Sequence, residues 1–243
     1  MPSREQFLKD IGAHPAIVQN PYTSALKEGV VGRTEIADFL VQFSIFADVF
    51  LPRIYDGYMT EQALQDFLTQ GLAEIASAVP IETMKVRNRA LATRATEHAV
   101  HMLERPLSRS ASQWRSAGAR AALWTWLCHE GRSGDGYGNV WHELLLGFQK
   151  SNSWLGGVPS LPTGFFGANL MIARCAGKQC LAQVNKPSLT GGSHDEWTFR
   201  HNAHLALNAV HLFWTDLQTR RERIKAGALL DPPYQKFRNV EGS

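Results

Sequence analysis

Residues 34–51 read TEIADFLVQFSIFADVFL, and their spacing indicates the fold class. The apolar residues recur at steps of three, four and seven, which is the period of an α-helix with one buried face; they are Ile36, Phe39, Leu40, Phe43, Ile45, Phe46 and Phe50. The hydroxyl of Thr34 can accept a hydrogen bond from a backbone N–H of the first turn. The stretch therefore predicts a core helix capped by Thr34.

The same helical period recurs through the rest of the chain, in segments separated by proline and glycine. Helices are expected over 60–78, 81–104, 112–130, 139–150, 163–184 and 194–225. Thr60 would cap the first of these, and Pro80 and Pro106 bound the second, because proline and the residue before it disfavour a helix. No segment alternates as a strand does, so we expect an all-α bundle. It forms a single domain over 1–243, in which 226–243 is an irregular C-terminal tail.

Composition argues against several classes of partner. A formal net charge of +3 over 243 residues is too small to indicate nucleic acid. No apolar run approaches the roughly 20 residues that span a membrane, and the charged N-terminal residues are unlike a secretory signal. The 3 cysteines lack metal-ribbon spacing and indicate reduced thiols in the cytoplasm. The basic cluster near the C-terminus is interpreted as the charge bias of a helix end; it comprises Arg220, Arg221, Arg223 and Lys225.

Histidines gather on the predicted helix 194–225. Taking His194 as zero, His201, His204 and His211 fall at roughly −20°, −80° and −100° around the helix, with Asn208 between them at roughly −40°. Apolar side chains share this sector; they are Trp197 and Leu212. We therefore expect the imidazoles on, or at the edge of, the buried face. Because buried imidazoles without partners are costly, this predicts a metal or a polar ligand pocket.

Two further clusters combine carboxylates with imidazoles. Glu97, His101 and Glu104 are spaced to share one helix face. Carboxylates together with imidazoles suit non-haem iron or manganese, although a surface pair near a helix end would have the same spacing. In the stretch CHEGRSGDGYGNVWHE (128–143), Glu130 and His142 flank a glycine-rich loop that lacks the spacing of a phosphate-binding loop.

Cys128 lies beside His129 in this stretch and is a candidate nucleophile. Adjacent helical residues point about 100° apart, however, so the two side chains do not face each other. A buried structural thiol is the alternative interpretation.

Three stretches together resemble the haem-oxygenase-like superfamily. They are NPYTSALKEGVVGRTEIADFLVQFSIFADVFLPRI (20–54), WLCHEGRSGDGYGNVWHELLLGFQKSNSWLGG (126–157) and FRHNAHLALNAVHLFW (199–214). This superfamily includes thiaminase II enzymes, the cofactor-free oxidase that completes pyrroloquinoline quinone, and non-haem iron oxidases and oxygenases. The resemblance implies a bundle of about seven to eight helices, and, because many members are dimers, a homodimer.

The resemblance also implies a set of iron ligands. Glu130 and His142 match the glutamate and histidine of the iron group, and His204 and His211 match the histidines of its final core helix. Asn208 stands where the iron group usually has aspartate, and helix 163–184 contains no glutamate where di-iron members place a bridging carboxylate. Glu97 and His101 are the next candidates. The predicted metal site therefore comprises Glu97, His101, Glu130, His142, His204, Asn208 and His211.

The function implied is an iron-dependent oxidase or oxygenase, with one or two iron ions. It would act with O2 on a small molecule such as an amino acid, a fatty acid or a biosynthetic intermediate of specialised metabolism. One alternative is a cofactor-free oxidase whose histidines move protons, which the neutral Asn208 and the glutamate-free helix favour. A second is a thiaminase II-like hydrolase with Cys128 as nucleophile. A third is a non-enzymatic helical interaction domain.

Overall fold

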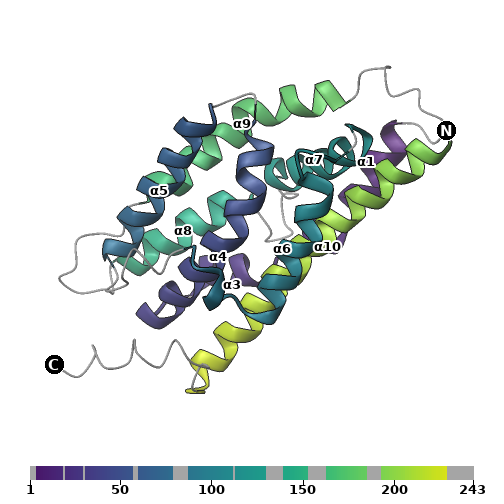
Figure 1. Ribbon diagram of the computed structural model, residues 1–243. Helices are drawn as coiled ribbons and strands as arrows, with labels where there is room; N and C mark the ends of the chain where they lie inside the picture. The colour runs from purple at the N-terminus through teal and green to yellow at the C-terminus, as the bar shows by residue number, and fades with distance from the viewer. Residues whose placement is uncertain are drawn as a thin grey trace.

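A computed structural model describes residues 4–18, 20–29, 31–56, 60–78, 87–111, 113–129, 139–152, 163–184 and 193–228 of the chain. Within these ranges the secondary structure is helical and contains no β-strand, which confirms the all-α class (Figure 1). None of the described helices combines the length and the apolar character needed to cross a membrane. The finer assignment to a haem-oxygenase-like bundle stays a prediction.

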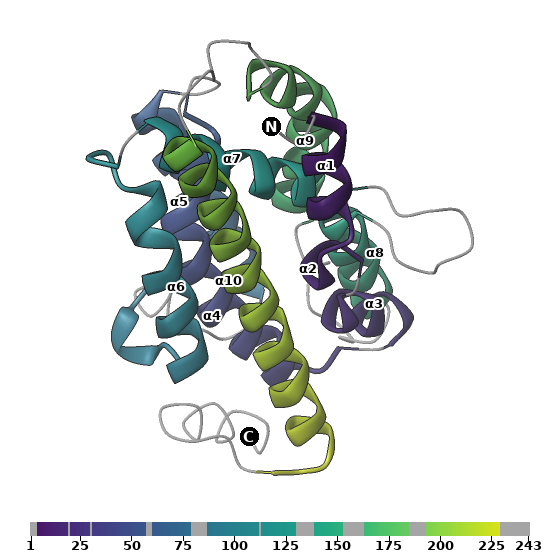
Figure 2. The ribbon, with the colours of Figure 1, turned by 90° about the vertical axis from the view of Figure 1, so that its right-hand side faces the viewer.

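Three short helices precede seven longer ones in the described part of the chain. The helices are α1 (Arg4–Gly12), α2 (Pro15–Val18), α3 (Pro21–Glu28), α4 (Arg33–Ile54), α5 (Glu61–Ala78), α6 (Arg94–Leu107), α7 (Gln113–Cys128), α8 (Val140–Asn152), α9 (Gly164–Val184) and α10 (Ser193–Lys225). The longest, α10, packs against α7 and α6 along most of its length and also contacts α2, α3 and α4. Figure 2 shows it running between α6 and the segment that carries α1 and α2. Helix α8 packs instead against α3 and α9.

Helix α4 begins and ends slightly outside the predicted range 34–51. Its N-cap is Gly32, not Thr34, and the carboxylate Oε2 of Glu35 accepts a hydrogen bond from the Gly32 backbone N–H at 3.0 Å. The helix continues through Pro52 to Ile54, because a proline in the last turn removes only one helical hydrogen bond. At the next helix, the prediction of Thr60 as cap is confirmed, since its Oγ1 accepts the Ala63 N–H at 3.2 Å.

The prediction of one helix over 81–104 is wrong. A short 3₁₀ turn occupies Arg89–Leu91, and α6 begins only after Thr93, whose Oγ1 accepts the Thr96 N–H at 3.0 Å. The helix then includes Pro106 rather than ending before it. The cause is the same as in α4, because a proline so close to the helix end removes only one hydrogen bond.

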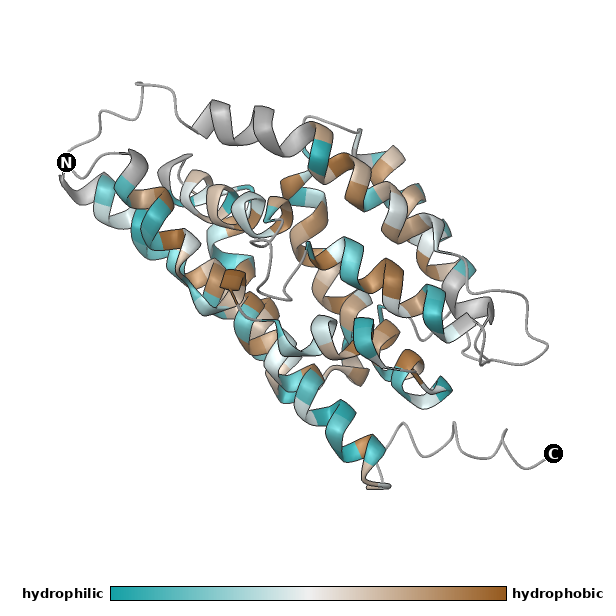
Figure 3. Cartoon of the chain, turned by 180° about the vertical axis from the view of Figure 1, so that it is seen from behind, coloured by the Kyte–Doolittle hydropathy of each residue, from teal (hydrophilic) through white to brown (hydrophobic). Residues whose placement is uncertain are grey.

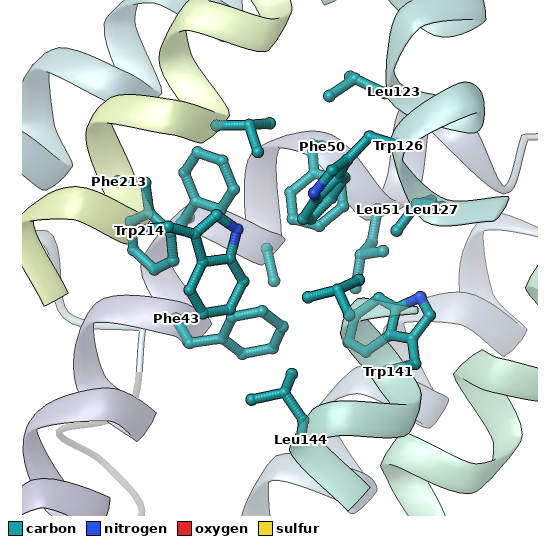
Figure 4. Packing of buried hydrophobic residues seen from close by; sticks show 14 of the residues in the cluster. Phe43, Phe50, Leu51, Leu123, Trp126, Leu127, Trp141, Leu144, Phe213 and Trp214 are labelled. Atoms are coloured by element: carbon teal, nitrogen blue, oxygen red, sulfur yellow. The ribbon is translucent and has the colours of Figure 1, made fainter. Parts of the chain in front are cut away.

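The centre of the core contains aromatic side chains of α4 that pack against α7, α8 and α10 (Figure 4). Phe46 stacks on Phe213 of α10, with ring centroids 4.2 Å apart. Phe43 meets Trp141 of α8 edge to face at 5.9 Å. Such pairs contribute about 0.5–1.5 kcal/mol each beyond the burial of their area. Helix α4 is consequently buried on nearly every side.

Two buried ion pairs join α10 to α4. The guanidinium of Arg220 donates from Nε and Nη2 to the two carboxylate oxygens of Asp38, at 2.9 and 2.7 Å. Nε of Arg221 lies 2.8 Å from Oε1 of Glu35. The interpretation of this basic cluster as a helix-end charge bias is therefore wrong for Arg220 and Arg221, which are buried against carboxylates. Only the remaining two basic residues of the cluster are exposed at the end of α10.

Gly118 allows α7 and α10 to approach closely. A Cβ at this position would overlap the backbone carbonyl of Phe199 on α10. Gly118→Ala should therefore lower the free energy of unfolding by about 1–3 kcal/mol, because a backbone cannot yield as a side chain does. Gly167→Ala on α9 is the control, since nothing lies within 4 Å of its Cβ. It should raise stability by up to about 1 kcal/mol. Urea denaturation measures both, and equal effects would contradict the close approach.

Asp38→Asn should lower the free energy of unfolding by about 3–5 kcal/mol, because it leaves the buried Arg220 without a counter-charge. The control is Asp48→Asn, which removes a partly exposed pair with Arg87 at 3.2 Å and should cost at most about 1 kcal/mol. Denaturant unfolding of the two variants tests this ranking. A loss for Asp38→Asn as small as that of the control would show that the buried pair does not hold α10 in place.

Candidate functional site

The predicted ligands of α10 lie on its outer side. His204 and Asn208 are exposed and His211 is half-buried. The expectation that these side chains lie on, or at the edge of, the buried face is therefore wrong for His204 and Asn208, whereas His211 lies at its edge. The buried side of α10 is formed by Ala203, Ala206, Leu207, Val210, Phe213, Trp214 and Leu217.

Two apolar residues on the same side of α10 as the histidines had suggested that this side is buried. Trp197 is 60% exposed, and its ring stacks on His201 with centroids 4.8 Å apart. Leu212 is only partly buried. Both side chains therefore cover the outer side of α10 and do not enter the core.

A third imidazole, which the sequence did not predict, reaches this surface. His14 lies in the turn between α1 and α2, and its Nε2 is 3.1 Å from Oδ1 of Asn208 on α10. Its ring centroid is 5.9 Å from that of His204. We call His14, His204, Asn208 and His211 the histidine cluster. The contact spans 194 positions in the sequence, so no local pattern could reveal it.

The hydrogen bonds of His14 define its tautomer. Its Nδ1 accepts a hydrogen bond from the backbone N–H of Ala16 at 3.2 Å. In the neutral ring the other nitrogen then carries the proton. His14 therefore donates from Nε2 to the amide oxygen of Asn208. A neutral amide accepts this bond without the negative charge that an aspartate would bring.

The pKa of His14 is lowered from its usual value of 6.5. Burial is the largest cause, and the neighbouring charges of His204 and His211 lower the pKa further, while the hydrogen bond to Asn208 opposes the shift. His14 is therefore neutral at pH 7. A neutral imidazole can accept a proton from a substrate.

The other predicted ligands lie on different helices. Glu97 and His101 are exposed on α6, and the neighbouring Glu104 forms an ion pair with Arg89. His142 is exposed near the start of α8. Glu130 lies outside the described residues.

Iron fits the described residues poorly. Among the ranges that the structure describes, no group of three or more His, Cys, Asp or Glu side chains is placed so that it could hold a metal ion. The partners of His14 in the cluster are imidazoles and an amide, whereas non-haem iron sites typically add a carboxylate. Because Glu130 is not described, the complete ligand set stays a prediction.

The buried carboxylate of the 128–143 stretch is Glu143, which the sequence analysis did not single out. It is fully buried and accepts a hydrogen bond from Oγ1 of Thr23 at 2.7 Å and one from Nζ of Lys27 at 3.4 Å. Both partners come from α3. Glu143 therefore joins α8 to α3 and has a structural role.

The candidate nucleophile Cys128 is held as a hydrogen-bond donor. Its half-buried Sγ donates to the backbone carbonyl of Ala173 on α9 at 3.2 Å. A bond of this kind requires the protonated thiol, whereas a nucleophile must be the thiolate. The hydrolase interpretation gains no support from this arrangement.

Comparison with known proteins identifies no relative. No family model, curated protein or solved structure matches the chain. Functional inference therefore depends on the residues themselves.

The pKa of His14 should move in opposite directions in two variants. Asn208→Ala removes the hydrogen bond that raises the pKa and should lower it further, whereas His204→Ala removes a repelling charge and should raise it. Because the native pKa is below the unfolded value of 6.5, this residue destabilises the fold as pH falls through 6.5 toward the native pKa. NMR titration of the imidazole measures both shifts. Shifts of the same sign in the two variants would contradict the cluster geometry.

Proposed function

We propose that the protein oxidises a small, electron-rich molecule with O2, and that the histidine cluster moves the protons. One observation carries the proposal: His14 joins His204, Asn208 and His211 on one surface while it is itself neutral, with a defined tautomer. The roles of the residues come from this geometry. The class of reaction comes from the resemblance to a superfamily that includes a cofactor-free oxidase.

The reaction needs a base that is neutral near pH 7. The substrate loses two electrons and two protons, and O2 receives them and becomes hydrogen peroxide. Deprotonation makes the substrate electron-rich enough to reduce O2, so an imidazole that accepts its proton lowers the barrier. His204 is exposed, so its imidazole is the one in the cluster that a bound substrate can contact directly. Asn208 can orient the substrate through its amide group, which carries no charge.

A second candidate is the iron-dependent oxidase or oxygenase that the resemblance implies. Its supporting observation is that two predicted ligands, His204 and His211, lie beside a third imidazole, His14. The resemblance implies that iron would supply the reaction with O2, with Glu130 as a carboxylate ligand.

Oxygen uptake and peroxide release separate the two candidates. The protein is first treated with a chelator, or loaded anaerobically with Fe(II), and its metal content is measured by mass spectrometry. A panel of catechols, hydroquinones and aminophenols then serves as substrate. We expect turnover that survives chelation and falls about 10²–10⁴-fold in His204→Ala. His201→Ala, on the same exposed side of α10 but outside the cluster, is the matched control and should keep full activity.

Two results would contradict the proposal. Turnover that requires bound iron and disappears in His142→Ala would support the sequence-predicted ligands instead. Absence of oxygen uptake by both the chelated and the iron-loaded protein across the panel would reject the reaction class.

A further inference from the structure

A groove lined by arginines lies apart from the histidine cluster, where α4, α5, α6 and α7 meet. It consists of two adjoining cavities of about 310 and 320 Å³. The two cavities adjoin, because five residues line both of them; these are Pro52, Arg53, Leu107, Ser108 and Arg109. We call it the arginine groove.

The carboxylates of the arginine groove are already paired. Asp56 lies 3.3 Å from Arg120, Glu104 pairs with Arg89, and Asp48 pairs with an arginine outside the groove. Four arginines line the groove against these three carboxylates. Positive charge is therefore in excess along its walls.

Arg53 is an arginine of the groove that has no partner among the described residues. It lies between the two cavities, is half-buried, and makes no hydrogen bond or ion pair within the described part of the chain. Its position in the last turn of α4 favours a positive charge, because of the helix dipole. The helix dipole explains why a positive charge is favoured at this position. It does not provide a hydrogen-bond acceptor for the N–H groups of the guanidinium.

A second donor in the groove also lacks an acceptor. Nε of Arg120 is buried and makes no hydrogen bond, although the same guanidinium pairs with Asp56 through Nη2. Ser108 adds a hydroxyl to the wall, and Ser116 brings the first turn of α7, the positive end of that helix, to the same cavity. A ligand that supplied several acceptor oxygens and negative charge would give the guanidinium of Arg53 the partners that it lacks among the described residues.

We propose that the arginine groove binds the phosphate group of a small molecule. The planar guanidinium of Arg53 matches two oxygens of a phosphate at once. Each of the two cavities, of about 310 and 320 Å³, is at the small end of ligand pockets, so the ligand is a small phosphorylated metabolite and not a polymer. The proposal does not depend on the oxidase activity proposed above.

Isothermal titration calorimetry at low salt tests the proposal with three probes: inorganic phosphate, phenyl phosphate and acetate. We expect both phosphates to bind and acetate to bind more weakly. In Arg53→Gln, phosphate binding should weaken about tenfold or more, because a charge-assisted bidentate contact is lost. Arg105→Gln is the matched control, since this exposed arginine of α6 lies outside the groove and loses the same charge. It should change the affinity less than twofold.

Thermal unfolding checks that both variants fold. For Arg53→Gln we expect at most a small decrease in melting temperature, because only the interaction with the helix dipole is lost. Arg53→Lys gives a second test, since it keeps the charge but loses the planar fork and should bind phosphate with intermediate affinity. The proposal is overturned if the wild-type protein does not bind either phosphate, or if Arg53→Gln binds like the wild type. An equal loss in Arg105→Gln would also overturn it, because binding would then follow net charge alone. Tighter binding of acetate than of phosphate would reassign the groove to carboxylates.

Discussion

The position of α10 depends on two buried ion pairs, Arg220 with Asp38 and Arg221 with Glu35. Charges removed from water are tolerated only when they meet their partners, so this side of α10 must face α4. A helix is rigid, and a rotation defined at one end therefore applies along its length. Leu207, Val210 and Trp214 consequently face the core, and the histidines face outward. Figure 3 shows that α10 is largely hydrophilic toward its C-terminal end, beside more hydrophobic central helices.

This rotation also decides where chemistry can take place. Aromatic rings from α4, α8 and α10 fill the space between these helices, with Phe43, Trp141 and Phe213 among them (Figure 4). The imidazoles are instead gathered where the turn before α2 meets α10. The proposed oxidation therefore takes place at the protein surface, with water close by. Protons released by the substrate can pass from the imidazoles directly to solvent, which suits a base that must return to its neutral form.

The sequence predicted the helices best where their causes are local. The apolar period of α4 and the hydroxyl cap of α5 depend on residues a few positions apart, and both are present in the structure. The prediction that a helix stops before Pro106 failed because the cost of a proline depends on its place within the helix, which the sequence pattern alone did not reveal. Arg220 and Arg221 were misinterpreted because their partners lie about 180 positions earlier in the chain and no spacing rule relates them.

The amino-acid sequence by itself determined the all-α class and the gathering of histidines on one sector of α10, because the helical period places residues around an axis without any knowledge of their surroundings. It could not determine which sector is buried, since both sides of α10 contain aromatic and aliphatic residues. That choice came from the tertiary structure, through the ion pairs with α4. The folded chain alone also decided the contact between His14 and Asn208. It likewise decided which arginines pair with the carboxylates of the groove, so that Arg53 has no partner among the described residues. Both depend on distances between helices that are remote in sequence.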